Sequence, residues 1–315
     1  MRTLPSLFAA ALVLASSGAA FAQTAYPFTL DNCGVSVTLP AAPQRVVTIR
    51  STSSEMLLAL GLGDRIVGVS FQDGPAPEPW TAQSLALPVL AEKLPSQEVV
   101  LATEPDLVYG GWESNFSADG AGERGILTNL GVASYVSPPA CRSVRPPKLT
   151  FDAVFDEIAQ VGAMFDATDS ANALIAGQRA ALSTVKPDTR GLTALWYSSG
   201  TKEPYVGAGN NAPQMMLEAL GLKNIMGDVD DGWVSASWEA IVDANPDVIV
   251  LVDAARNSAA QKQTLLAENP ITSRLDAVIN KRYLIIPFPA AEAGVRNVSA
   301  TVDMAAQLAG LGFTP

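Results

Sequence analysis

Side chains suited to binding a flat organic molecule follow several predicted strands, at the point where each strand ends. Ligands of open α/β sheets meet the carboxyl ends of the strands, so these positions predict one binding site. Aromatic rings bury flat ligands, and hydroxyl and guanidinium groups fix their orientation. The candidate ligand-binding residues that follow from this rule are Arg50, Ser51, Phe71, Trp112, Glu113, Tyr197, Tyr205, Trp233, Phe288 and Arg296.

The two arginines among these candidates bear on the charge of the ligand. A guanidinium group suits a carboxylate, a phosphate or an anionic chelate, so Arg50 and Arg296 favour an anionic ligand. Arg50 has an alternative role, which is to pair with a carboxylate of its own lobe. Trp112 follows two glycines at a strand end, where a bulky ring is hard to bury, and this favours a place in the binding site.

The chain of 315 residues contains no histidine, which restricts the chemistry that it could perform. Histidine is the commonest general base near neutral pH and the commonest metal ligand. Its absence excludes Ser-His-Asp and Cys-His catalysis, and two cysteines alone cannot complete a zinc shell. We therefore expect a protein that is not an enzyme and has no metal site and no cofactor, although carboxylate chemistry stays open.

The first 22 residues are predicted to be a signal peptide. Arg2 supplies a positive charge, residues 7–15 form a short apolar run, and residues 20–22 fit a cleavage site. The run is too short to span a membrane, which takes about 20 apolar residues. No cysteine stands at the cleavage site, so a lipid anchor is not indicated. The sequence thus predicts an exported, periplasmic protein without a membrane anchor.

Cys33 and Cys141 are the only cysteines. An even pair in an exported protein is most simply a disulfide, which we expect here. A reactive thiol pair is the alternative, and the absence of a CxxC spacing disfavours it.

The formal net charge is −11, and the basic residues do not cluster. Nucleic acids are bound through clustered positive charge, so this distribution disfavours them as partners. The acidic balance is adequately explained by solubility.

Two segments of the chain recur at matching spacing. The sequence EVVLATEPDLVYGG begins at Glu98, and EAIVDANPDVIVLV begins at Glu239. A second pair matches as well, with MLLALGLGDRIVGV at Met56 and MLEALGLKNIMGDV at Met216. The repeats predict two related lobes in tandem, and two such lobes are built to close on a ligand.

Alternating apolar strands and helical segments predict an α/β fold. We expect two Rossmann-like lobes, each with a mostly parallel sheet flanked by helices, joined by a long rigid helix. The predicted divisions are a signal peptide at 1–22, a first lobe at 23–150, linker helices at 151–187 and a second lobe at 188–315. Within the second lobe, residues 265–280 are expected to be mostly helical.

These segments resemble the periplasmic substrate-binding proteins of the iron-siderophore and cobalamin ABC importers, in the TroA-like superfamily. The blocks RVVTIRSTSSEMLLALGLGDRIVGVS, PVLAEKLPSQEVVLATEPDLVYGG and SWEAIVDANPDVIVLV carry the resemblance, which covers about residues 45–310. Further segments, including YPFTLDNCG and PFPAAEAGVRN, most closely resemble a branch assigned to import of a deazaflavin-coenzyme precursor.

The resemblance also implies how the protein meets its transporter. In the family, one glutamate on each lobe docks on arginines of the permease. The matching positions here are Glu55, six residues before Gly61, and Glu218, three residues before Gly221. Two exposed carboxylates on two lobes could report the spacing between the lobes. A solvated helix carboxylate is the alternative at each position.

The sequence thus predicts a monomeric binding protein that captures a siderophore, corrinoid, haem or deazaflavin-like ligand between two lobes. Its partners would be an ABC permease with its ATPase. Two alternatives stay open, which are an exported carboxylate-based hydrolase and a ligand-sensing subunit on the same scaffold.

Overall fold

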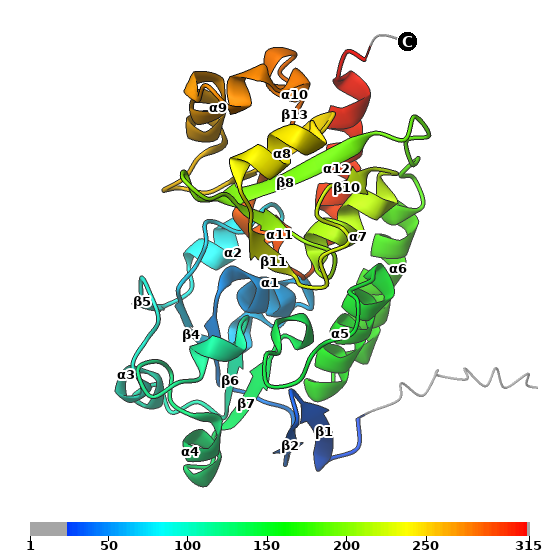
Figure 1. Cartoon of the computed structure of the whole chain (residues 1–315). Coiled ribbons are helices and arrows are strands. Elements are labelled where there is room, and N and C mark those ends of the chain that lie inside the picture. Colours follow the sequence, from blue (N-terminus) through cyan, green and yellow to red (C-terminus); the bar gives the residue numbers. More distant parts are fainter. Residues whose placement is uncertain (1–23, 314–315) are drawn as a thin grey trace, which may run out of the picture.

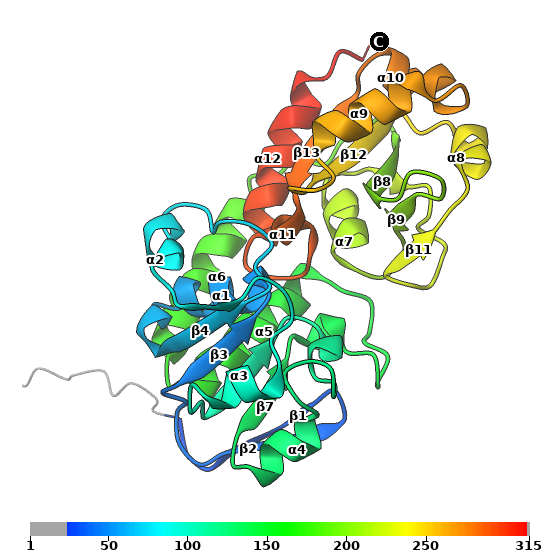
Figure 2. The same ribbon diagram turned by 90° about the vertical axis from the view of Figure 1, so that its left-hand side faces the viewer.

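The computed structural model describes residues 24–313, so the predicted signal peptide lies outside the described residues. Two separate β-sheets form two lobes, one above the other in Figure 1. In the rotated view of Figure 2 the second lobe lies at the upper right. The prediction of a two-lobe α/β fold is confirmed.

The sheet of the first lobe has five parallel strands in the order β5-β4-β3-β6-β7. The central strand is buried along its whole length, as its β-branched residues require. The strands are β3 (Val46–Ile49), β4 (Ile66–Ser70), β5 (Val89–Ala91), β6 (Leu107–Gly110) and β7 (Ala133–Val136). A separate hairpin of β1 (Phe28–Asn32) and β2 (Val35–Leu39) contacts β7 through its second strand.

The sheet of the second lobe has the order β11-β9-β8-β12-β13, with β10 beside the start of β8. β8, β10, β12 and β13 run parallel, whereas β9 and β11 are antiparallel additions at one edge. The strands are β8 (Thr193–Ser199), β9 (Tyr205–Gly207), β10 (Lys223–Asn224), β11 (Trp233–Ser235), β12 (Val248–Asp253) and β13 (Tyr283–Pro287). The sheet is mostly parallel, as predicted, but the antiparallel edge was not predicted.

Twelve α-helices lie among residues 24–313. In the first lobe they are α1 (Ser51–Ala59), α2 (Thr81–Leu85), α3 (Gln97–Leu101) and α4 (Arg124–Asn129). Two helices follow as the connector, α5 (Phe151–Met164) and α6 (Thr168–Leu182). The remainder are α7 (Ala212–Ala219), α8 (Trp238–Ala244), α9 (Ala259–Glu268), α10 (Asp276–Ile279), α11 (Phe288–Ala291) and α12 (Asn297–Gly310).

Residues 265–280 are mostly helical, as predicted, but the helix is interrupted: the end of α9, a short 3-10 turn at Thr272–Arg274 and α10 follow one another. The first helix, α9, begins earlier because Ser258 and Gln261 form a capping box at its start. The chain then leaves the helix at Asn269 and forms the separate short helix α10.

The repeated Pro-Asp of the sequence has the same structural role in both lobes. Asp106 precedes β6, and its carboxylate accepts hydrogen bonds from the amides of Gln44 and Arg45, just before β3. Asp247 precedes β12, and its carboxylate accepts from the amide and hydroxyl of Thr193, at the start of β8. In each lobe the repeat therefore fixes the beginning of two neighbouring strands.

The matching glycines after the repeated leucine-rich helices also agree in conformation. Gly61 follows α1 with a φ of 75°, and Gly221 follows α7 with a φ of 74°. Glycine adopts this left-handed conformation without the steric cost of a Cβ. At Gly221 a Cβ would also lie 2.3 Å from the carbonyl oxygen of Asp188. Both the backbone conformation and this close contact therefore disfavour a larger residue at this position.

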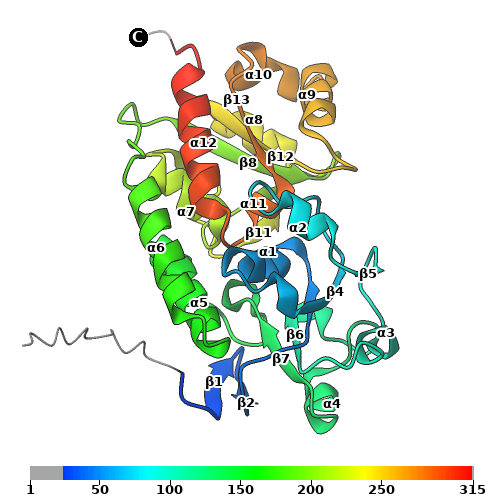
Figure 3. The ribbon, with the colours of Figure 1, turned by 180° about the vertical axis from the view of Figure 1, so that it is seen from behind.

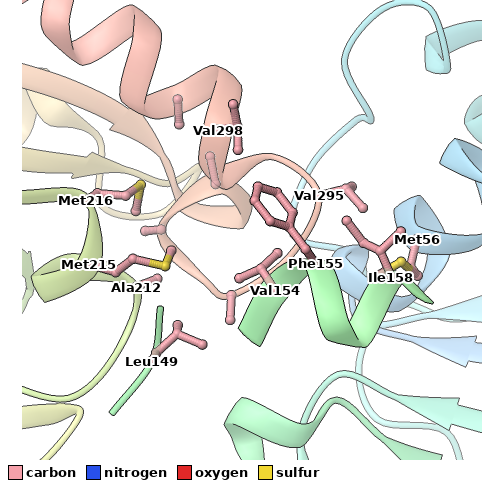
Figure 4. Packing of buried hydrophobic residues seen from close by; sticks show 14 of the residues in the cluster. Met56, Leu149, Val154, Phe155, Ile158, Ala212, Met215, Met216, Val295 and Val298 are labelled. Carbon is pink, nitrogen blue, oxygen red and sulfur yellow. The ribbon is translucent and has the colours of Figure 1, made fainter. Parts of the chain in front are cut away.

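The two connector helices run along one side of both lobes, as Figure 3 shows from behind. α5 packs against α6, and α6 packs against the C-terminal helix α12. The core is continuous between the lobes through this region. Figure 4 shows Met56 of the first lobe, Phe155 and Ile158 of α5, and Met216 and Val298 of the second lobe in one cluster. A shared core of this kind favours limited tilting of the lobes over free hinge motion.

Two tyrosines of the first sheet hold the connector. The hydroxyl of Tyr109 on β6 donates to Oε1 of Glu157 on α5 at 3.0 Å, and the hydroxyl of Tyr135 on β7 donates to Gln160 at 2.7 Å. Glu157 is buried, and its Oε2 has no hydrogen-bond partner among the described residues. Burial raises the pKa of Glu157 to about 7, although its hydrogen bonds oppose the shift.

We predict that Glu157→Gln stabilises the protein at alkaline pH and has little effect at acidic pH. The native pKa of Glu157, about 7, lies above the ordinary value of 4.5. Stability from the neutral carboxyl is therefore complete below the ordinary pKa and is lost as the pH rises through 7. At about 1.4 kcal/mol per pKa unit, the gain in the variant should approach about 3 kcal/mol at high pH.

Urea unfolding of both proteins between about pH 4 and pH 8 measures this difference. Glu239→Gln, at an exposed position of α8, is the matched control and should differ from the wild type by a constant amount. Parallel pH curves for the wild type and Glu157→Gln would contradict the prediction.

Candidate functional site

A cavity of about 730 Å³ lies between the two lobes and is lined by residues of both. Four of the predicted ligand-binding residues line it: Trp112 from the first lobe, and Tyr205, Trp233 and Phe288 from the second. Trp112 comes just after β6 and Phe288 just after β13, so both lie at carboxyl ends of parallel strands. The placement agrees with the rule for open α/β sheets.

The other two aromatic residues come from the antiparallel edge of the second sheet. Tyr205 begins β9 and Trp233 begins β11, two strands that pair with each other. Their rings are stacked, with centroids 5.9 Å apart and planes 16° from parallel. This pair offers a flat apolar face to a ligand.

The guanidinium group of Arg50 lies behind the aromatic wall. Its central carbon is 3.5 Å from the ring centroid of Trp112, 4.4 Å from that of Phe71 and 5.4 Å from that of Phe288. Its Nη2 is 2.8 Å from Oδ1 of Asp73, and 3% of the side chain is exposed. Arg50 thus supports the aromatic residues, and it pairs with a carboxylate of its own lobe, which was the alternative role.

The backbone around this group is strained. Arg50 has a φ of 83° and Phe71 a φ of 51°, conformations that cost a non-glycine residue on the order of 1–3 kcal/mol. Gly111 makes room for the arginine, because a Cβ there would lie 2.8 Å from the Cβ of Arg50. Such strain persists only where the surrounding contacts enforce it, and it gathers at functional sites.

Ser51 and Asp73 complete this part of the site without lining the cavity. The hydroxyl of Ser51 accepts a hydrogen bond from the amide of Asp73 at 2.8 Å, which places the carboxylate beside Arg50. Burial raises the pKa of Asp73 to about 6, against the opposing effect of Arg50. The carboxylates of Glu292 and Glu55 raise the same pKa further.

Tyr197 lies in the core of the second lobe instead of the cavity. Its ring packs edge-on against Trp238, and its hydroxyl donates to the carbonyl of Gly200 at 2.5 Å. With 1% of its surface exposed, it supports β8 and the turn that follows. The strand-end rule failed here because β8 continues to Ser199, so Tyr197 lies within the strand, and it is Ser198 and Ser199 that line the cavity.

Glu113 holds a neighbouring segment instead of facing a ligand. Its carboxylate accepts hydrogen bonds from the amides of Arg142 and Ser143 and from the Ser143 hydroxyl. These residues belong to a segment at 141–148, which we call the strap. Most of the strap lines the cavity.

The strap is tied to both lobes. Cys141 forms the predicted disulfide with Cys33, in the turn between β1 and β2. Arg145 forms an exposed ion pair with Asp230 of the second lobe. The strap therefore forms part of the cavity wall. A covalent bond holds it to the first lobe, and a weaker, exposed ion pair holds it to the second.

Arg296 does not reach the cavity, because it is paired with Glu55. The guanidinium group makes two hydrogen bonds to the Glu55 carboxylate and donates to the carbonyl of Pro75 at 2.9 Å. Glu55 is on α1 of the first lobe and Arg296 directly precedes α12, so the pair joins the lobes. Burial raises the pKa of Glu55, while Arg296 opposes that shift.

The two carboxylates predicted to dock on a permease therefore differ in environment. Glu55 is 2% exposed, so the expectation of an exposed carboxylate is wrong at this position. Glu218, on α7, is about half exposed and pairs with Lys148 of the strap and with Gln214. Docking by either residue stays a prediction.

Several cavity residues were not predicted from the sequence. They are mostly polar and come from the strap, from the loops around α7 and β11, and from the segment after α11: Arg142, Arg145, Asn210, Asn211, Asp230, Asp231 and Glu292. Glu292 lies four residues after Phe288, and the strand-end rule could have found it if the short helix α11 had been allowed for.

Within residues 24–313, no group of three His, Cys, Asp or Glu side chains could hold a metal ion. No helix in the same range is long and apolar enough to cross a membrane. The arrangement combines aromatic faces with many polar side chains, which suits binding of an organic molecule that carries polar groups.

Comparison with known proteins agrees with this geometry. The family model described as periplasmic binding protein matches residues 46–290. An uncharacterised ABC transporter substrate-binding lipoprotein of Bacillus subtilis is 25% identical over 288 residues, covering 89% of this chain and 85% of that protein. A cobalamin-binding protein of Halobacterium salinarum is 27% identical over 275 residues, covering 82% and 69%.

A solved structure is also similar along nearly its whole length. The crystal structure of an ABC-type Fe³⁺-hydroxamate transport system of Saccharomonospora viridis superposes with a TM-score of 0.78. It is 26% identical, and the match covers 90% of this chain and 99% of that chain.

The anchoring of the strap yields a prediction that needs no ligand. Replacing both cysteines by serine (Cys33→Ser with Cys141→Ser) should lower the free energy of unfolding by about 2–5 kcal/mol. It should also loosen the strap locally, so trypsin should cut after Arg142 at least about tenfold faster than in the wild type. Each 1.4 kcal/mol lost in local stability raises the population of the open, cleavable state about tenfold. Timed digestion with mass spectrometry measures the rate.

The chain provides controls for this experiment. Arg145 precedes Pro146, so trypsin should not cut there in either protein. Cleavage after Arg190, an exposed residue beyond the connector helices that is followed by Gly191, should be unaffected by the strap. An unchanged rate after Arg142, with lower global stability, would show that the disulfide does not hold the strap.

Proposed function

This chain belongs to the periplasmic binding protein family, and we propose that it is the solute-binding component of an ABC import system. It captures a medium-sized organic or metal-chelate ligand in the cavity between the lobes and delivers the ligand to a membrane permease with its ATPase. The observation that carries the proposal is the cavity of about 730 Å³, whose aromatic walls come from both lobes. Its size falls in the range of small-molecule sites, about 300–1,000 Å³.

The ligand classes in this proposal are siderophores, corrinoids, haem and deazaflavin-like compounds. The names of the cobalamin-binding relative and of the Fe³⁺-hydroxamate transport structure support the first two classes. The deazaflavin class rests only on the resemblance of sequence segments. A periplasmic location and a monomeric state are part of the proposal.

The alternative of a carboxylate-based hydrolase has no specific support in the geometry. Trp112, Phe288 and Glu292 line the part of the cavity that we call its floor. The carboxylates nearest this floor are those of Asp73, Glu55 and Glu292, and they are engaged by Arg50, Arg296 and the Trp112 indole, respectively. A binding protein returns its ligand unchanged, and analysis of the recovered ligand tests this directly.

Tryptophan fluorescence should identify the ligand class. A panel of ferric siderophores, cobalamin, cobinamide, haem and deazaflavin precursors should contain one compound that quenches emission saturably, at low micromolar concentration or below. Trp112→Phe and Trp233→Phe should weaken its affinity about 5- to 30-fold, as expected when aromatic anchors of a site are truncated.

Trp238→Phe is the matched control. Trp238 is buried outside the cavity, where its indole donates to the carbonyl of Thr201. The control should keep the affinity of the wild type. A flat response to the whole panel would remove these ligand classes, and an equal loss in all three variants would place the ligand elsewhere.

The docking proposal predicts different effects at its two carboxylates. Glu218→Ala should lower ligand uptake by cells about tenfold without changing ligand affinity, because an exposed docking charge acts only on the partner. Glu55→Ala should lower the free energy of unfolding by about 3–5 kcal/mol, because it leaves the buried Arg296 charge unpaired.

Uptake assays with labelled ligand, together with urea unfolding of each variant, measure these effects. Glu239→Ala, at an exposed position on another helix of the same lobe, is the control for uptake. If Glu218→Ala weakens ligand affinity, or leaves uptake unchanged, the docking assignment is wrong.

A further inference from the structure

The charges at the floor of the cavity differ from the sequence-based expectation of an anion site. Both predicted anion-binding arginines are engaged by carboxylates: Arg50 by Asp73, and Arg296 by Glu55. Neither arginine lines the cavity. The charge that does reach the cavity floor is the carboxylate of Glu292.

Glu292 is fixed in place by both lobes. Its Oε2 accepts a hydrogen bond from the indole Nε1 of Trp112, in the other lobe, at 3.0 Å. Its own carbonyl accepts from the side-chain amide of Asn297 at 2.7 Å. No described residue donates to its second carboxylate oxygen, Oε1, so one acceptor of a held carboxylate is left for a ligand.

The environment of Glu292 favours a donor over water as its partner. Burial raises the pKa of Glu292, with the Trp112 hydrogen bond and the charge of Arg50 acting against that rise. A ligand group that carries N–H bonds or a positive charge would compensate the buried carboxylate. A ligand carboxylate or catecholate at the same place would add a second negative charge to it.

The rest of the cavity does not reverse this balance. Its acidic and basic lining residues are two arginines, Arg142 and Arg145, and three carboxylates, Asp230, Asp231 and Glu292. Arg145 is already paired with Asp230. The cavity therefore has no surplus of positive charge for an anionic chelate, and its aromatic walls are compatible with a cation.

We infer that this cleft selects a neutral or cationic ligand, flat or macrocyclic, that donates a hydrogen bond from an amide or ammonium group to Glu292. The inference rests on the proposed function and narrows it. Amide-bearing corrinoids and neutral or cationic ferric hydroxamates fit this description. Ferric catecholates and haem, whose outer groups are anionic, do not.

Two matched pairs of probes test the inference on the mature protein. Dicyanocobinamide bears carboxamides on its corrin ring, whereas dicyanocobyrinic acid bears carboxylates on the same ring. The ferric complex of desferrioxamine B carries an ammonium group, and its N-succinyl derivative carries a carboxylate instead. Within each pair the body is constant and the charge changes.

In at least one pair, the amide or ammonium member should bind about 30-fold tighter, or more, than its anionic counterpart. Glu292→Gln keeps an acceptor for Trp112 and removes the charge, so it should reduce that preference to about threefold or less. Glu239→Gln, with the same change of net charge outside the cavity, should keep the preference of the wild type. Calorimetry gives the affinities, and circular dichroism verifies folding.

The possible outcomes distinguish failure of this inference from failure of the proposed function. Anionic members that bind as tightly as their counterparts, or a preference that survives in Glu292→Gln, would overturn the inference and leave the binding function intact. Failure of all four probes to bind, together with failure of haem and a ferric catecholate, would overturn both. Binding of haem or the catecholate alone would overturn only the charge selection.

Discussion

Two buried guanidinium groups at the junction of the lobes require neutralisation, and much of the site follows from how this is achieved. A buried charge without a partner costs several kcal/mol, so Arg50 and Arg296 each need a carboxylate close by. Arg50 finds Asp73 within its own lobe, which fixes the chain after β4. Arg296 finds Glu55 in the other lobe, which joins α12 to α1. Once both are paired, the carboxylate of Glu292 is left facing the cavity beside Trp112.

The aromatic residues are arranged around this same group. The ring of Trp112 covers the guanidinium group of Arg50 on one side and donates its indole N–H to Glu292 on the other. Phe71 packs edge-on against Trp112, with ring centroids 6.3 Å apart. The first lobe thus presents an aromatic face whose orientation is held by charge. The pair of Tyr205 and Trp233 is held by strand pairing, by stacking of the two rings and by packing of Trp233 against the core.

The sequence allowed the scaffold to be predicted better than the site, for identifiable reasons. Repeats, strand patterns and the Pro-Asp motif are local signals, and the hydrogen bonds of Asp106 and Asp247 show that each repeat has the same structural role. Trp112 and Phe288 could be placed because the strand-end rule is also local. The partner of Arg296 could not be predicted, because Glu55 is 241 positions away in the sequence. The charge of the site could not be predicted either, because it depends on which ion pairs form. The antiparallel edge of the second sheet has strands of three residues, too short for a periodic pattern.

The strap joins the lobes by ion pairs of a different kind from those at the floor. Arg145 with Asp230, and Lys148 with Glu218, are largely exposed, whereas Arg296 with Glu55 is buried. Dissolved salt weakens the interaction between exposed charges, with a screening length of about 10 Å at 0.1 M ionic strength. It weakens the interaction between buried charges far less. Raising the ionic strength should therefore loosen the strap, which forms part of the cavity wall, while the buried pair of Arg296 and Glu55 stays in place. Entry and exit of a ligand would then vary with the salinity of the surroundings, and the preference for one ligand over another would not.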